Sequence, residues 1–363
     1  MKKSLLALAV LGAFTGIASA QTSVTIYGVV DAGITREDNG TRTSVRLDSG
    51  NQSSGRLGFK GNEDLGGGLS AQFLLENGFS IDTGALGQGG LIFGRQAYVG
   101  LTGNFGQVRL GRQKTVMYDA LAAIDPFGIA SKGGMDRLFM TATSENSFAA
   151  GASPATPSSR TFGVGRSNNT IAYFTPNLFP GFVGEVTYTL GEQAGNNQAG
   201  RQYGISLNYA AGPLFATLDY LNVNSVPGAL TTIQTARSTL LGATYDFTVA
   251  KAHAAFGIDK GGLPGSGGDQ REYMLGASIP FGASAVLLDY VRKNDRSGNN
   301  AGAKQYALGY TYALSKRTNF YSSYVATKQN AFNYISDPVT ATTGTALANS
   351  TDRTINVGVR HTF

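Results

Sequence analysis

Apolar and polar residues alternate along most of the chain after residue 21, in segments of about ten residues. In the segment 355–363 the odd positions are mostly apolar, whereas the even positions are small or polar. A period of two is typical of a β-strand that has one apolar face and one hydrated face. This segment ends on Phe363, although the last strand of a soluble domain more often frays into polar residues.

Short and long connections separate these segments in alternation. The short ones are rich in Gly, Pro, Asn and Ser, which favour tight turns, and lie at 63–68, 103–106, 175–181, 210–213, 248–251, 279–284 and 313–317. The long ones lie at about 36–54, 80–91, 114–166, 192–201, 224–237, 259–270, 294–303 and 328–352. Seven short and eight long connections predict sixteen antiparallel strands, with both ends of the chain on the short-turn side.

The sorting of the loops favours an all-β transmembrane barrel. Barrels of outer membranes have an even strand count, short turns on one side and long loops on the other. Closure is needed because an open sheet edge in hydrocarbon would leave backbone groups unpaired. Arg56 and Lys60 alternate with Leu57 and Phe59, which predicts charged side chains in a water-filled lumen. A two-sheet sandwich would explain one such hairpin, but it would not explain sixteen strands whose long loops all lie at one end.

The first twenty residues have the composition of a secretory signal. Two lysines precede an apolar stretch from Leu5 to about Ile17, and Ala18-Ser19-Ala20 has the form that signal peptidase cleaves. The apolar stretch is shorter than the roughly 20 residues of a spanning helix. We therefore expect residues 1–20 to be cleaved and residues 21–363 to form one barrel domain.

Composition excludes several classes of protein. The chain has no Cys, so neither a disulfide framework nor a thiolate metal site is available. The formal net charge of +6 falls to +4 when Lys2 and Lys3 leave with the signal, which does not indicate a nucleic-acid partner. The two histidines, His253 and His361, have no catalytic motif beside them, so a barrel enzyme is disfavoured. No cofactor and no metal site are expected.

Four stretches carry a family resemblance: SVTIYGVVDAGI (23–34), SGRLGFKGNEDLGGGLSAQFLLE (54–76), FGRQAYVGLTGNFGQVRLGRQ (93–113) and the terminal GVRHTF. They resemble the general-diffusion porins of Gram-negative outer membranes, most closely the beta-proteobacterial branch with its anion-selective members. The resemblance implies a sixteen-stranded barrel, a homotrimer and a third extracellular loop that folds into the lumen as a constriction. It also implies that Phe363 belongs to the signal read by the barrel-assembly machinery.

The third long connection, 114–166, is the candidate for that constriction loop. It exceeds 50 residues, and a loop of that length usually has a function. Its segment 116–129 resembles the part of the loop that family members press against the barrel wall. The acidic residue that enterobacterial members have between Pro and Phe is missing, and Asp125 is the nearest carboxylate. Asp119 and Asp125 are the expected loop charges.

Arginines are expected on the opposing wall. Arg56 and Arg112 match wall arginines of the family, Arg95 and Arg166 match positions used by anion-selective members, and Arg160 is a weaker candidate. Glu76 matches an inward carboxylate that could hold one arginine in place. Strict alternation would put Arg95 and Arg112 on the apolar face, so each needs a β-bulge beside Gly94 or Gly111 to turn it inward.

The function predicted from these features is passive diffusion of small hydrophilic solutes, with anions favoured by a basic ring. One alternative is a solute-specific porin, in which Tyr27, Tyr98 and Tyr118 would contribute to a row of aromatic side chains along the lumen. An outer-membrane enzyme and an adhesin are two further alternatives. For each arginine by itself, a solvated surface charge is the simpler interpretation. Contact with lipopolysaccharide, or a divalent ion at the loops, is compatible with this location, but no cluster in the sequence selects a site.

Overall fold

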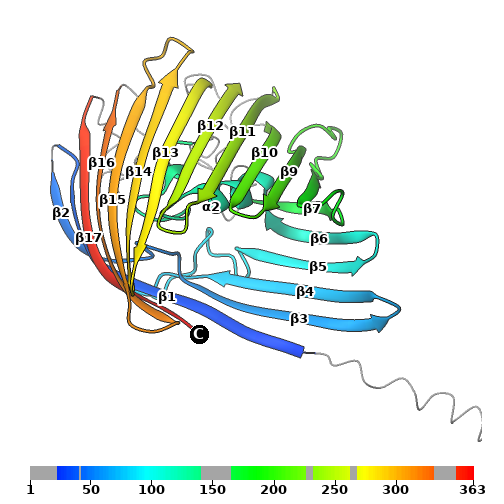
Figure 1. The fold of residues 1–363 in the computed structure, drawn as a ribbon. Helices are drawn as coiled ribbons and strands as arrows, with labels where there is room; N and C mark the ends of the chain where they lie inside the picture. The colour runs from blue at the N-terminus through cyan, green and yellow to red at the C-terminus, as the bar shows by residue number, and fades with distance from the viewer. Residues whose placement is uncertain (1–22, 41, 140–164, 226–231, 262–267, 331–348) are drawn as a thin grey trace, which may run out of the picture.

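The computed structural model describes residues 23–40, 42–139, 165–225, 232–261, 268–330 and 349–363. The predicted signal peptide and Arg160 lie outside these ranges. The described part forms a curved sheet that closes on itself around a central space (Figure 1). None of its helices is long and apolar enough to cross a membrane.

Sixteen strands form the barrel wall, and they confirm the predicted all-β, antiparallel, closed architecture. They are β1 (Ser23–Asp38), β3 (Arg56–Gly66), β4 (Leu69–Gly78), β5 (Gln96–Gly103), β6 (Gly106–Lys114), β7 (Arg166–Phe174), β8 (Phe182–Thr189), β9 (Gln202–Ala211), β10 (Leu214–Ser225), β11 (Gln234–Asp246), β12 (Lys251–Gly261), β13 (Asp269–Phe281), β14 (Ser284–Asp295), β15 (Ala303–Ala313), β16 (Thr318–Gln329) and β17 (Thr351–Thr362). All seven predicted short connections join consecutive wall strands. Consecutive strands pair along the chain, and β17 pairs with β1 to close the ring.

The first long connection contains a strand that the sequence analysis left within a loop. Strand β2 (Thr43–Ser49) pairs with the upper part of β1, from Ala32 to Asp38, whereas the lower part of β1, from Ser23 to Val29, pairs with β3. Its apolar side chains Val45 and Leu47 are exposed. The segment is therefore an extra hairpin at the long-loop end of the wall, in addition to the sixteen wall strands.

The two faces of the wall differ as the alternation predicts. Outward side chains such as Leu218, Leu275 and Leu308 are about half or more exposed, whereas their neighbours Asp219 and Met274 on the lumen side are buried. A band of outward apolar residues is what hydrocarbon requires of a barrel.

The third long connection folds inside the barrel. Its first part forms helix α2 (Val116–Ile124), which lies within the ring in Figure 1 and contacts β8 to β12. A 3₁₀ turn, η1 (Met135–Arg137), follows. The apolar side of α2 packs on inward side chains of the wall in a cluster that includes Leu121, Ile124, Leu221, Leu240 and Met274. One side of the lumen is thus an apolar core, and the wet lumen expected from the strand pattern is restricted to the remainder.

Glycines make room for this loop on four alternate strands. A Cβ at Gly204 would lie 2.9 Å from Val116, one at Gly242 2.5 Å from Ile124, one at Gly276 2.8 Å from Pro126 and one at Gly309 2.6 Å from Phe127. Real Cβ atoms do not approach other atoms so closely. The absence of side chains at these four wall positions therefore lets the loop lie against the sheet.

Candidate functional site: the lumen constriction

Helix α2 presents Tyr118 to a group of cations from β3, β6, β7 and the residue before β5. The helix begins after Thr115, whose hydroxyl accepts a hydrogen bond from the Tyr118 amide at 3.3 Å. This cap fixes the first turn. The Tyr118 ring lies 4.8 Å from the Arg166 guanidinium and 5.0 Å from Lys114 Nζ, close enough for cation–π attraction.

The pKa of Tyr118 reports how many positive charges converge here. Burial alone would raise the pKa of the phenol, but Arg166, Arg95, Lys114 and Arg56 together hold it below its usual value. These cations come from β7, the approach to β5, the end of β6 and the start of β3. The structure therefore brings the predicted Arg56, Arg95 and Arg166 together around one loop residue.

Arg95 is held by a carboxylate in the wall. Its Nε donates to Glu76 Oε1 at 2.7 Å, and Tyr27 donates its hydroxyl hydrogen to Glu76 Oε2 at 2.8 Å. Arg95 is 2% exposed and Glu76 3%. A charge-assisted pair of this kind fixes the guanidinium in one position. Arg95 precedes the first residue of β5, so the alternation that would direct it outward does not apply to it, and no bulge at Gly94 interrupts the β4–β5 pairing.

Arg112 sits in a β-bulge. The pairing of β6 with β7 shifts register between Gly111 and Gln113, and Gly111 has a φ of +137°, a conformation that favours glycine. Arg112 Nε donates to the Gly94 carbonyl oxygen at 2.7 Å, and Nη1 donates to Asn168 Oδ1 at 2.7 Å. This arginine therefore ties the segment before β5 to β7, and its side chain is 8% exposed.

Arg56 stands at the start of β3 and is less enclosed than the other arginines. Its Nη2 donates to Ser53 Oγ at 2.9 Å, and its Nε donates to the Ser54 carbonyl oxygen at 3.3 Å. Arg360 of β17 adds a further positive charge within electrostatic range of it. The sequence analysis did not select Arg360, although it lies on the lumen-facing even positions of the last strand.

The two predicted loop acids have different surroundings. Asp119 accepts a hydrogen bond from Lys114 Nζ at 2.8 Å and is partly exposed. Asp125 is enclosed within the loop, where its carboxylate accepts hydrogen bonds from the amides of Met135 at 2.7 Å and Phe127 at 2.8 Å. Burial, followed by the nearby charge of Asp136, raises the pKa of Asp125 to about 7. Asp125 therefore stabilises the conformation of the loop through these hydrogen bonds. Its role as a charge in the pore constriction stays a prediction.

The loop is anchored to the wall at several points that the sequence did not reveal. Lys293 Nζ donates to the Leu138 carbonyl oxygen at 2.7 Å and forms a fully buried ion pair with Glu272. Gln305 donates to the Gly133 carbonyl oxygen at 3.0 Å, and a ring nitrogen of His253 lies 2.8 Å from the Ile124 carbonyl oxygen. The buried histidine is thus a contact of the loop.

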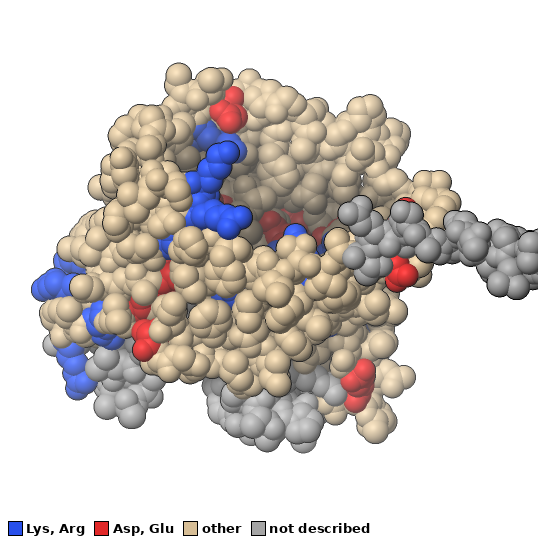
Figure 2. All heavy atoms as spheres, turned by 90° about the horizontal axis from the view of Figure 1, so that it is seen from below, with Lys and Arg blue, Asp and Glu red and all other residues tan. Residues whose placement is uncertain are grey.

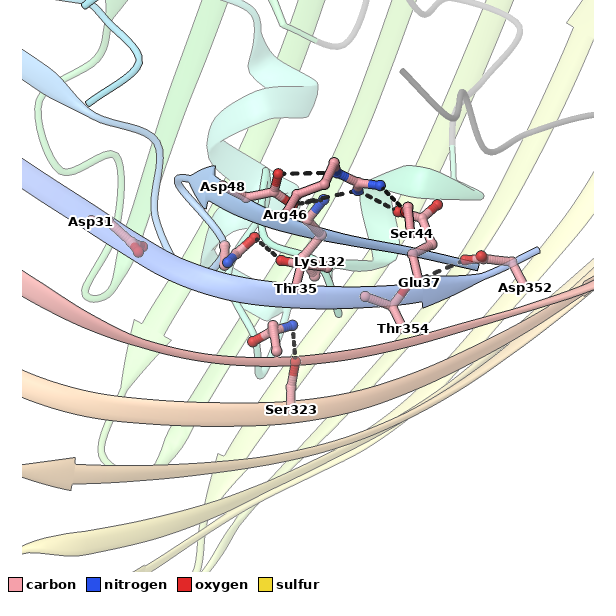
Figure 3. Close-up of polar contacts among 12 residues, drawn as sticks. Asp31, Thr35, Glu37, Ser44, Arg46, Asp48, Lys132, Ser323, Asp352 and Thr354 are labelled. Carbon is pink, nitrogen blue, oxygen red and sulfur yellow. Dashed lines mark hydrogen bonds and ion pairs between the residues drawn. The ribbon is translucent and has the colours of Figure 1, made fainter. Parts of the chain in front are cut away.

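A further anchor joins the loop to the β2 hairpin. Figure 3 shows Arg46 of β2 between Glu37 of β1 and Asp48, at 2.6 and 3.2 Å, and Lys132 of the loop reaching the same Asp48 at 3.2 Å. Strand β2, in the first long connection, therefore contributes the carboxylate of Asp48, which binds Lys132 of the third long connection. In the space-filling view, the barrel is hollowed, with basic side chains along one side of the opening and acidic ones deeper inside (Figure 2). Among the described residues, no group of three or more His, Asp or Glu is arranged to hold a metal ion.

Comparison with known proteins agrees with this architecture. A family model described as Gram-negative porin matches residues 7–331. The chain belongs to this family. The porin is 36% identical, over 385 aligned positions covering all of both chains, to outer membrane porin protein 32 of Delftia acidovorans. It is 30% identical over 419 positions, again covering all of both chains, to an outer membrane porin of Bordetella pertussis.

A solved structure gives the same result in three dimensions. The porin superimposes with a TM-score of 0.78 on an anion-selective porin from Comamonas acidovorans, with 31% identity, over 94% of this chain and 100% of that one. The described barrel is thus that of a Gram-negative outer-membrane porin, whose wall encloses a channel. The predicted porin family, barrel and membrane location are confirmed.

Proposed function

We propose that this porin prefers anions, and that the preference is set where Tyr118 of the loop faces Arg56, Arg95 and Arg166 of the wall. The observation that carries the proposal is the convergence of Arg166, Arg95, Lys114 and Arg56 on Tyr118, while the wall carboxylate Glu76 is paired with Arg95. The solved porin from Comamonas acidovorans, which shares the fold, is described as anion-selective, and this supports the proposal.

The mechanism is diffusion through a local positive potential. Guanidinium groups stay charged at any relevant pH, so the wall keeps its charge under all ordinary conditions. A ring of positive side chains attracts anions into the narrow part of a pore and disfavours cations. The ions remain hydrated in such a passage, and the preference is screened over a Debye length of about 8 Å at physiological ionic strength. The channel needs neither an energy source nor a catalytic step.

We infer a homotrimer in the outer membrane, inserted by the barrel-assembly machinery. Phe363 and Gly28 exchange two backbone hydrogen bonds of 3.1 Å, so the aromatic residue directly after β17 continues the pairing with β1 that closes the barrel. A position at the end of the closing strand supports a role for Phe363 in assembly.

The test of the anion preference is the zero-current potential of the purified porin in a planar bilayer under a salt gradient. We expect an anion-selective potential in the wild type, and a permeability ratio lower by about threefold in Arg56→Ser/Arg166→Ser, because two lumen charges are lost. The matched control is Arg36→Ser/Arg353→Ser, which removes two exposed arginines from the outer side of β1 and β17. A cation-selective wild type, or equal changes in the two variants, would reject the proposed constriction.

A further inference from the structure

A hollow of about 450 Å³ lies in the lumen wall, on the short-turn side of the arginine cluster. Its lining includes Tyr27, Lys60, Leu74 and Tyr98, from β1, β3, β4 and β5. Tyr27 donates to the lumen carboxylate of Glu76, and Leu74 is two residues before Glu76, so both point to the same face. Lys60 and Tyr98 are the direct cross-strand partners of Leu74. The hollow therefore opens to the channel and not to lipid.

Lys60, Leu74 and Tyr98 form a row across three strands. The register places Lys60 directly opposite Leu74, and Leu74 directly opposite Tyr98. Neighbouring strands are about 4.8 Å apart, so the backbones at the two ends of the row are separated by about 10 Å. A cation, an aliphatic side chain and an aromatic ring thus follow one another over the length of a small solute.

The charge of Lys60 is not neutralised by a neighbouring side chain. Lys60 is exposed, and none of the ion pairs among the residues that the structure describes includes it. Its Nζ lies 5.5 Å from the centre of the Tyr27 ring, and Tyr27 is itself fixed by its hydrogen bond of 2.8 Å to Glu76. The ammonium group of Lys60 can therefore pair with an anion in the channel.

The other end of the row is apolar, although it faces water. Leu74 is half-buried and does not belong to the core that packs on α2. Tyr98 is also half-buried, and the Arg109 guanidinium lies over its ring at 4.9 Å and over the Phe174 ring at 4.2 Å. Cation–π contacts of this kind hold the Tyr98 ring in place. Leu74 and Tyr98 therefore offer a fixed apolar surface, which gains free energy when another apolar group covers it.

Amide groups complete the hollow on the side of the short turns. Asn62 and Gln72 line it and are direct cross-strand partners. The Gln72 amide donates to Thr102 Oγ1 at 3.2 Å, and Asn62 is exposed. Next to the row there are thus hydrogen-bonding groups that suit a hydroxyl substituent of a solute.

We propose that this hollow is a transient binding site for aromatic monocarboxylates that pass through the channel. The carboxylate pairs with Lys60, and the ring of the solute lies over Leu74 and against Tyr98. A hollow of this volume is within the range of sites that hold small molecules. The inference goes beyond the proposed anion preference, because the arginines attract every anion, whereas this site selects those that carry a ring.

The test is the reduction of single-channel current by solutes titrated into potassium chloride at neutral pH and constant ionic strength. The probes are benzoate, acetate, which has the same charge without a ring, and benzamide, which has the same ring without a charge. The variants are Lys60→Gln, Tyr98→Leu and the two combined. The control, Lys251→Gln/Tyr310→Leu, removes a lysine from the lumen face of β12, where His253 also lies, and an exposed tyrosine from β15. Open channels in chloride alone show that each variant has folded.

In the wild type, we expect benzoate to reach half of its maximal effect at a concentration about tenfold below those of acetate and benzamide, because only benzoate makes both contacts. Lys60→Gln should bring the benzoate value close to that of benzamide, and Tyr98→Leu should bring it close to that of acetate. The control should match the wild type.

Equal half-maximal concentrations of benzoate and acetate in the wild type would overturn the proposal, as would a benzoate preference that the combined variant keeps. Zero-current potentials in chloride alone test the arginines separately. A cation-selective wild type that still favours benzoate would therefore reject the proposed anion preference and support this site.

Discussion

Tyr118 is the loop residue on which cations of the wall converge, and its ionisation is coupled to the arginines around it. Because neighbouring cations hold the pKa of the phenol below its ordinary value of 10, a phenolate forms at a lower pH here than on an exposed tyrosine. That phenolate would place a negative charge among the cations of the proposed constriction.

We therefore expect the anion preference of the wild type to decline as the pH is raised from neutral towards 10. In Tyr118→Phe the decline should be smaller over that interval, because the titrating hydroxyl is gone. Zero-current potentials recorded across a pH series measure the anion preference of the wild type and of Tyr118→Phe. A parallel decline in the two proteins would mean that another group is responsible.

Asp125 gives the loop its own pH dependence. Its folded pKa of about 7 lies above the roughly 3.9 of an unfolded aspartate, so the folded loop binds this proton more tightly than the unfolded chain does. Stability from this source is fully present below about pH 4 and is lost as the pH rises through 7. Asp136, whose pKa burial raises to about 6, acts in the same direction.

Asp125→Asn should flatten this dependence. We expect the wild type to gain roughly 2 kcal/mol of resistance to unfolding between about pH 8 and pH 5, and the variant to gain clearly less. Denaturant unfolding of the detergent-folded porin gives both values, and Asp119→Asn, on the same loop but ion-paired at the surface, is the control. If Asp125→Asn and the wild type show the same pH dependence, the buried carboxylate is not its source.

The loop as an element is held by contacts that join distant parts of the chain. Helix α2 packs on β8 to β12, while Lys293 and Gln305 bind the segment that follows it. The sequence predicts a loop of over 50 residues but neither its helix nor where it docks, because Lys293 and Gln305 lie 155 and 172 residues from the loop residues that they bind. The strand pattern also conceals the apolar side of the lumen, since Leu240 and Met274 occupy positions that alternation assigns to water.

Breaking the buried Lys293–Glu272 pair tests this anchoring. Lys293→Met removes the lysine partner of the fully buried Glu272 and should destabilise the porin by about 3 kcal/mol or more. Lys293→Met/Glu272→Gln removes both charges and should be much closer to the wild type. Thermal unfolding ranks the three proteins, and fluctuations of single-channel current should increase only in the first variant. A double variant that is as unstable as the single one would argue against the ion pair.

At the scale of the whole molecule, the barrel wall can be predicted because it depends on local sequence patterns. Each face alternates with period two and each short turn joins neighbours in sequence, so the sixteen wall strands and their order can be read from the chain. The arginine cluster is harder to predict. The inward direction of Arg112 depends on a bulge at Gly111, and that of Arg95 depends on the end of strand pairing before Gln96. Alternation by itself gives the wrong face for both, and the resemblance to porins identified them instead.

The whole channel should respond to salt through its charged lumen. Raising ionic strength from about 0.1 M to about 1 M shortens the Debye length from about 10 Å to about 3 Å. We therefore expect the permeability ratio of the wild type to approach that of Arg56→Ser/Arg166→Ser at high salt. Zero-current potentials at a fixed gradient ratio and rising mean concentration give the comparison. A ratio independent of salt would indicate selection by pore size and not by charge.

The seam between β1 and β17 constrains the order of events during folding. Gly28 and Phe363, which exchange their backbone hydrogen bonds, stand 335 positions apart in the sequence, whereas every other junction of the wall joins strands that follow one another along the chain. Contacts of such sequence separation form late because the closure entropy must be met first. Hairpins can therefore assemble progressively from any point of the sheet, but the ring can close only after the last strand has been delivered.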